Sequence, residues 1–165
     1  MTTFTDHPSS TTGGGFTASD RLGDHLQQIL VDLIALQLQA KQAQWNVIGR
    51  NFRDVHLQLD EIMNISRDAA DTIAERMRAL GKVADGRAPT VAGTARLTPL
   101  PLGELGTPTV VDLITDGMRA VVADIRRFHD DIDGEDPSTS DLLHGMVVEL
   151  EKQAWMLSAE NRVAR

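Results

Sequence analysis

Apolar side chains recur every three to four positions in four segments of this chain, which is the period of one face of an α-helix. No segment shows an apolar–polar alternation typical of a strand. The four segments therefore predict four helices. Their apolar stripes cover residues 22–43, 52–80, 110–132 and 143–157.

Capping and breaking residues support these bounds. Ser19 or Asp20 is expected to cap the first helix, and Gly81 to end the second. Thr107 is expected to cap the third helix, with Pro108 in its first turn. The polar run 133–141 (DGEDPSTSD) is expected to break the third helix, and Asp136-Pro137 or Ser138 within it to start the fourth.

The connection at 81–108 contains five glycines and four prolines, so only a short helical turn fits within it. A connection of this length can cross a whole bundle, which lets the second and third helices run in the same direction. We therefore predict an all-α four-helix bundle with a long crossover between helices two and three. One domain at 19–161 is expected, with a flexible N-terminal tail at 1–18 and a short C-terminal tail at 162–165.

The composition restricts the chemistry further. With 24 acidic against 16 basic residues, the net charge is −8, which repels nucleic acid and attracts cations. The chain has no cysteine, which excludes disulfides and thiolate metal sites. No apolar run approaches the length of a membrane span, and no signal-peptide pattern begins the chain. We expect a cytoplasmic protein with no membrane contact and with metal ions as partners.

Four side chains that can bind metal ions lie on one face of the second predicted helix. They form two pairs spaced four residues apart, His56 with Asp60 and Asp71 with Glu75. At about 100° per residue, all four fall within a stripe of roughly 100°, away from the apolar stripe. Acidic residues on a polar face are usually only solvated, and three arginines share this face: Arg53, Arg67 and Arg78. Spacing alone leaves both interpretations open.

The two pairs are too far apart to bind one ion together. At about 1.5 Å per residue, Asp60 and Asp71 lie about 16 Å apart along the helix axis. Nitrogen and oxygen ligands bind iron or zinc at about 2.0–2.2 Å. A second, antiparallel copy, related by a two-fold axis near Ile65 and Ser66, would bring the first pair of one chain against the second pair of the other. One imidazole and three carboxylates suit Fe(II) and tolerate Zn(II) or Mn(II).

Residues 41–81 resemble the Dps family of small ferritin-like cages, also described as starvation-induced DNA-binding proteins. The family pattern is K-x-x-H-W-N-V-x-G-x-x-F-x-x-x-H-x-x-x-D followed by D-x-x-A-E-R. This chain has KQAQWNVIGRNFRDVHLQLD and then DTIAERMRALG. The resemblance implies a ferritin-like fold and a homo-oligomer of twelve subunits. It also implies ferroxidase-type oxidation of Fe(II) by hydrogen peroxide between two-fold-related subunits, with storage of ferric iron and protection against oxidative damage.

The family's iron-site residues carry over by position. The matching residues are His56, Asp60, Asp71 and Glu75, with Trp45 beside the centre. Gln44 stands where the family has its first ligand histidine. An amide oxygen is a weaker ligand than imidazole, so we expect a weakened or inactive centre. Glu61 is a candidate for mineral nucleation, but Leu57 is apolar where family members often have an acid.

The acidic residues before the fourth helix resemble those that line the three-fold pores of the family's cages. They are Asp133, Glu135, Asp136 and Asp141. A ring of such carboxylates would attract Fe(II) into the cage. An ordinary charged turn with helix-capping acids is equally compatible with the sequence.

DNA binding is expected to be weak or absent. Residues 1–20 contain no lysine or arginine, and the whole chain has only three lysines. Few phosphates can therefore be neutralised. Three functions stay open: an iron-oxidising storage cage, a nucleoid-associated protein that protects DNA, and a structural shell whose metal site has decayed. The acidic composition disfavours the DNA-protecting protein. Whether the metal site still works with Gln44 in place of histidine distinguishes the iron-oxidising cage from the decayed shell.

Overall fold

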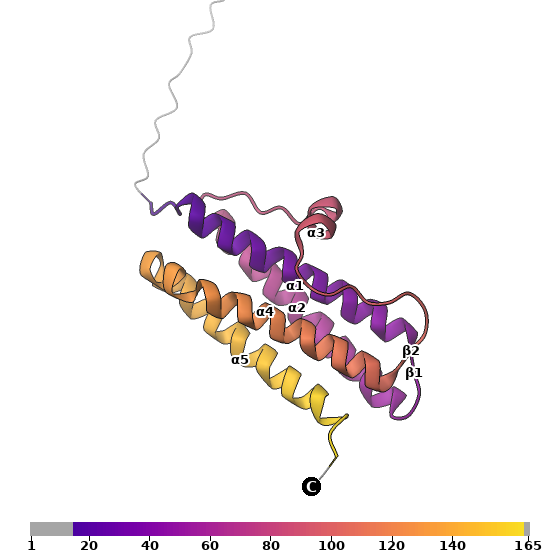
Figure 1. The fold of residues 1–165 in the computed structure, drawn as a ribbon. Coiled ribbons are helices and arrows are strands. Elements are labelled where there is room, and N and C mark those ends of the chain that lie inside the picture. The colour runs from indigo at the N-terminus through magenta and orange to yellow at the C-terminus, as the bar shows by residue number, and fades with distance from the viewer. Residues whose placement is uncertain (1–14, 164–165) are drawn as a thin grey trace, which may run out of the picture.

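The structure is a computed structural model that describes residues 15–163; residues 1–14, which include His7, and residues 164–165 lie outside it. Four long helices form a bundle (Figure 1). They are α1 (Asp20–Asn46), α2 (Phe52–Ala79), α4 (Thr107–Glu135) and α5 (Pro137–Ala159). The predicted all-α fold is confirmed.

The apolar stripes of the four helices meet in the centre of the bundle. Helices α1 and α2 pack as one hairpin and α4 and α5 as a second. Each helix contributes side chains that are at most 1% exposed, among them Leu33, Leu59, Ile114 and Leu143. Burial of such side chains stabilises the fold by about 1.5–3 kcal/mol each, which explains why the stripes set the helix orientations.

The crossover returns the chain to the end of the bundle where α2 began. It contains the short helix α3 (Ala88–Thr94), and its last strand β2 (Leu105–Gly106) pairs in parallel with β1 (Val47–Ile48). As Figure 1 shows, α2 and α4 consequently run in the same direction. The crossover was predicted, including a short helical turn within it.

Polar groups on α1 attach the crossover to the bundle. The Asp32 carboxylate is 1% exposed and accepts hydrogen bonds from the Arg96 backbone N–H at 2.7 Å and from Gln28 Nε2 at 3.0 Å. Burial raises the pKa of Asp32 despite these hydrogen bonds. Gln27 exchanges two hydrogen bonds with the backbone of Asp85. These contacts hold the glycine- and proline-rich segment against α1.

Two predicted helix boundaries were displaced. The N-cap of α1 is Ser19, whose hydroxyl accepts a hydrogen bond from Leu22 N, as expected. The N-cap of α4 is Gly106, so Thr107 is the first helical residue rather than the cap. The fourth helix begins at Pro137, as predicted, but the break before it is reduced to Asp136 because α4 continues to Glu135.

The continuation of α4 has a tertiary cause. Glu135 accepts hydrogen bonds from the backbone N–H and the hydroxyl of Ser19, both at 2.6 Å. These contacts attach the last turn of α4 to the start of α1 and outweigh the low helix propensity of the glycine and aspartates there.

Within residues 15–163, no helix combines the length and apolar character needed to cross a membrane.

Candidate metal centre

His56 lies on the first half of α2, opposite the C-terminal end of α1. Its Nδ1 atom lies 3.0 Å from the backbone oxygen of Gln44. That oxygen can only accept, so the proton of a neutral imidazole is placed on Nδ1 and the lone pair of Nε2 is left free. Metal-binding histidines are commonly oriented by a second hydrogen bond of this kind. The ring is half-buried.

Asp60 lies one turn further along α2 and is held by two residues of α1. Gln44 Nε2 donates a hydrogen bond to Asp60 Oδ1 at 2.8 Å, and Lys41 Nζ lies 3.5 Å from the same oxygen. The Gln44 hydrogen bond is the largest influence, and with Lys41 it lowers the pKa of Asp60 despite some desolvation. The carboxylate is therefore ionised at neutral pH but already has a cation beside it.

Gln44 lies between Lys41 and Asp60 and contacts both. Its side chain is 5% exposed, and its amide oxygen accepts a hydrogen bond from Lys41 Nζ. The amide nitrogen faces Asp60. The orientation follows from the partners, since an ammonium only donates and a carboxylate only accepts. Gln44 therefore positions Asp60 in this structure instead of presenting a free ligand oxygen.

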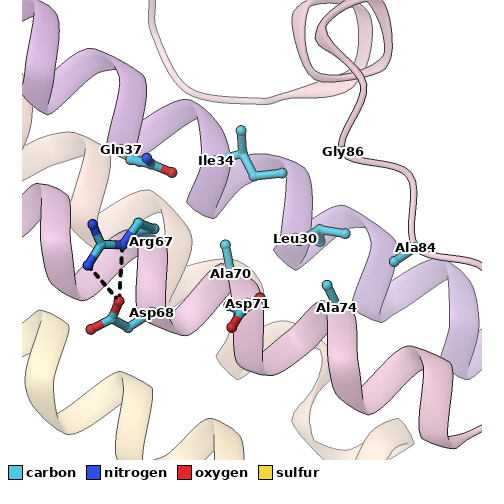
Figure 2. Close-up of a pocket in the computed structure, with 10 residues that line it drawn as sticks. All are labelled: Leu30, Ile34, Gln37, Arg67, Asp68, Ala70, Asp71, Ala74, Ala84 and Gly86. Carbon is cyan, nitrogen blue, oxygen red and sulfur yellow. Dashed lines mark hydrogen bonds and ion pairs between the residues drawn. The ribbon is translucent and has the colours of Figure 1, made fainter.

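Asp71 lies on the second half of α2 at the edge of a groove between α1, α2 and the crossover. Figure 2 shows the lining residues; the groove has a volume of about 510 Å³. Small and aliphatic side chains also line this groove, among them Ile34, Ala70 and Ala74. Arg67 pairs with Asp68 at 3.2 Å. Among the described residues, neither Asp71 nor Glu75 has a hydrogen-bond or ion-pair partner, and both are exposed.

The two predicted ligand pairs, here called half-sites, lie apart on one continuous helix. Because α2 is unbroken from 52 to 79, the rise of a helix places Asp60 and Asp71 about 16 Å apart. No three histidine, aspartate or glutamate side chains in the described part of the chain lie close enough to hold a metal ion together. A second chain is required to complete a centre from these residues.

Comparisons with known proteins place this chain in a family. A family model described as a ferritin-like domain matches residues 23–163. The "DNA protection during starvation protein" of Agrobacterium fabrum is 34% identical over 135 residues, which cover 81% of this chain and 83% of that protein. The chain belongs to the Dps family of ferritin-like proteins.

Other Dps relatives and solved Dps structures agree. "DNA protection during starvation protein 2" of Deinococcus radiodurans is 38% identical over 135 residues, 81% of this chain, but the match spans only 56% of that protein. Dps92 from Deinococcus radiodurans has a TM-score of 0.82 at 34% identity and covers 85% of both chains. Dps from Microbacterium arborescens in the high iron form has a TM-score of 0.82 at 30% identity, covering 88% of this chain and 98% of that one.

An exposed apolar surface adjoins the first half-site of this Dps chain. Trp45 is 69% exposed, and the ammonium of Lys41 lies 5.9 Å from its ring centroid. Phe52 is 45% exposed, with its ring centroid 5.4 Å from that of His56. Trp45 therefore does not pack in the core of its own chain. Exposed aromatic groups beside a half-site are typical of a surface that a partner covers.

The acidic residues predicted to line a pore are divided by the structure. Asp133 and Asp141 are exposed, as is Glu61 on α2. Asp136 is 8% exposed and binds Arg76 and Thr139 of its own chain. Glu135 is bound to Ser19. For Asp136, the alternative of a structural acid at a helix junction is the one that the contacts support.

Lys41 is the residue at this centre that the sequence interpretation missed. It lies three residues before Gln44 on the same helix face, and it is part of the quoted family pattern. That spacing was the available signal. The distance from Lys41 to Asp60 depends on how α1 and α2 pack, which the sequence pattern does not specify.

Proposed function

We propose that this chain is a subunit of a Dps-type cage that oxidises Fe(II) with hydrogen peroxide and stores the ferric product. The observation that carries the proposal is the pair of half-sites on α2, one with an oriented imidazole and the other with two unpaired carboxylates. An antiparallel contact between two copies forms two identical centres from them. A dodecamer is proposed from the family. The relative from Microbacterium arborescens, described in a high iron form, also supports an iron-related function.

The proposed reaction uses two Fe(II) ions for each peroxide. Each iron gives up one electron, the O–O bond breaks, and two hydroxide equivalents form. His56 supplies a neutral nitrogen ligand, and the carboxylates lower the charge of the ferric product, which stabilises it relative to Fe(II). The apolar surface around Trp45, covered by the second chain, limits access of water to the centre.

The neighbours of Asp60 make this a weak centre. Lys41 places a positive charge 3.5 Å from the carboxylate oxygen that an iron ion would bind. Gln44 binds the same oxygen and adds no nitrogen ligand. Iron must displace both interactions, so we propose a lower affinity for Fe(II) than a centre with two histidines has. Slow oxidation distinguishes this proposal from a decayed shell, which would show none.

Replacing Gln44 with histidine is expected to raise the initial rate of Fe(II) oxidation at limiting iron by about tenfold. The reason is that the imidazole adds a ligand and removes the amide that binds Lys41 and Asp60. The measurement is ferric absorbance after anaerobic Fe(II) and hydrogen peroxide are added to the iron-free protein. Gln44→Ala is the control, since it releases Asp60 without adding a ligand. An equal increase in Gln44→Ala would contradict the ligand argument.

DNA protection is a second candidate, because several relatives carry that name. With a net charge of −8 and three lysines, the chain is expected to bind DNA more weakly than about 10⁻⁴ M at physiological salt. The measurement is plasmid mobility in a gel at neutral pH across a salt series. Binding that appears only at low salt agrees with the prediction. A clear shift at about 0.15 M salt would overturn it.

A further inference from the structure

Two histidines face each other across the α4–α5 junction, on elements that contribute nothing to the half-sites of α2. His129 lies in α4 and His144 in α5, and their Nε2 atoms are 3.0 Å apart. The ring centroids lie 5.1 Å apart with the planes inclined by 27°. The side chains are 37% and 56% exposed, so ions in solution can reach them.

Carboxylates lie beside the outer nitrogen of each ring. Asp130 Oδ1 is 3.0 Å from His129 Nδ1, and Asp141 Oδ1 is 3.8 Å from His144 Nδ1. A neutral imidazole carries one proton, and a neighbouring carboxylate favours placing it on the nearer nitrogen. This arrangement leaves a lone pair on each Nε2, and the two nitrogens lie 3.0 Å apart. At this separation the lone pairs repel unless a proton or a metal ion is shared between them.

The separation of the two nitrogens fits a shared metal ion. Ligands at about 2.0–2.1 Å and 90–110° from one ion lie roughly 2.9–3.4 Å apart. Ser140 Oγ lies 3.4 Å from His129 Nε2 and adds a hydroxyl oxygen beside the pair. Carboxylates that orient the outer nitrogens of ligand imidazoles are a recurrent feature of protein metal sites.

We propose that His129 and His144 bind a divalent late first-row transition metal ion, with solvent completing the coordination. Two imidazoles without a thiolate suit Zn(II), Ni(II) and Cu(II). The exposed carboxylates of Asp130 and Asp141 attract such cations. Because one ligand comes from each helix, the ion ties α4 to α5 beside the junction at Asp136. The proposal does not depend on Fe(II) oxidation at the α2 half-sites.

The test uses Zn(II) and the full chain carrying His56→Ala and Asp71→Ala, so that the α2 half-sites are silent. Calorimetric titration at neutral pH is expected to show one micromolar site per chain. His144→Ala is expected to remove it, and Asp130→Asn to weaken it up to about tenfold. His25→Gln is the matched control, since His25 pairs with Asp131 instead and its loss leaves the site intact.

A second readout follows from the tie between helices. Zn(II) that binds the folded chain raises its melting temperature in a concentration-dependent manner. This increase is expected in the silent background and in His25→Gln, and is expected to disappear in His144→Ala. If the two rings share a proton instead of a metal ion, the chain will bind no more Zn(II) than the His144→Ala variant does. That result, or binding that persists in His144→Ala, would overturn the proposal.

Discussion

His56→Ala and Asp71→Ala are each expected to lower the rate of Fe(II) oxidation by more than about 100-fold. A cage assembled from a mixture of the two variant chains is nevertheless expected to recover part of the activity. His56 and Asp71 belong to opposite half-sites about 16 Å apart on α2. In a pair made of one chain of each variant, one of the two centres contains both intact half-sites. The other centre contains both substitutions. Recovery therefore depends on the centre being shared between chains.

Random pairing sets the size of the recovery. Half of the pairs are mixed and each mixed pair has one intact centre of two, so about a quarter of all centres are active. The measurement is the initial rate of ferric absorbance after peroxide addition, on cages purified through two different tags. Asp68→Ala is the matched control, because Asp68 is exposed on the same helix and pairs only with Arg67 in the described residues.

The mixed cage separates three models. Recovery to about a quarter supports centres between chains. Inactivity of the mixed cage, with both single variants inactive, would show that the two pairs do not meet across an interface. Full activity of either single variant would place the oxidation elsewhere in the protein. Circular dichroism of each variant verifies that the helices are intact, as expected for two side chains outside the core.

The helices were predictable because their signal is local. Each apolar stripe appears within its own segment, and the glycine- and proline-rich connection between α2 and α4 defines the crossover. The start of the fourth helix was predicted correctly, but the third helix was expected to break at 133, whereas α4 continues to Glu135. This continuation depends on Ser19, more than a hundred residues earlier, which binds Glu135 and keeps the last turn of α4 helical. A local pattern does not contain that contact.

Side-chain roles at the candidate centre were less predictable for the same reason. The spacing of His56 and Asp60 predicted a ligand pair, and the position of Gln44 indicated a departure from the family pattern. The sequence did not show that the Gln44 amide would turn its nitrogen to Asp60 and its oxygen to Lys41. That orientation requires the register between α1 and α2. The ligand types follow from sequence, and their hydrogen bonds follow from packing.

Arg76→Ala is expected to lower the free energy of unfolding by about 2–4 kcal/mol. Arg76 Nη2 donates to Asp136 Oδ2 at 2.5 Å and Nε donates to Thr139 Oγ1 at 2.8 Å, which attaches α2 to the start of α5. The side chains of the ion pair are only 24% and 10% exposed. Removing the arginine leaves the Asp136 charge buried with no cation beside it, facing only the Thr139 hydroxyl and the Ser138 backbone N–H. Urea unfolding followed by circular dichroism, at one protein concentration, measures the loss.

The loss is also expected to depend on pH, with a definite sign. Burial alone would raise the pKa of Asp136, but hydrogen bonds from Thr139 and Arg76 outweigh it and hold the pKa below its ordinary value. A lowered carboxyl pKa stabilises the fold above the unfolded value of about 3.9, and this contribution disappears as pH falls through the lower folded value. The difference in unfolding free energy between wild type and Arg76→Ala is therefore largest near neutral pH and narrows below about pH 4.

Arg119→Ala, which removes an exposed pair with Asp116, is the control and is expected to lower the free energy of unfolding by less than about 1 kcal/mol. An equal loss of unfolding free energy in both variants would show that the α2–α5 contact stabilises the fold no more than an exposed ion pair does.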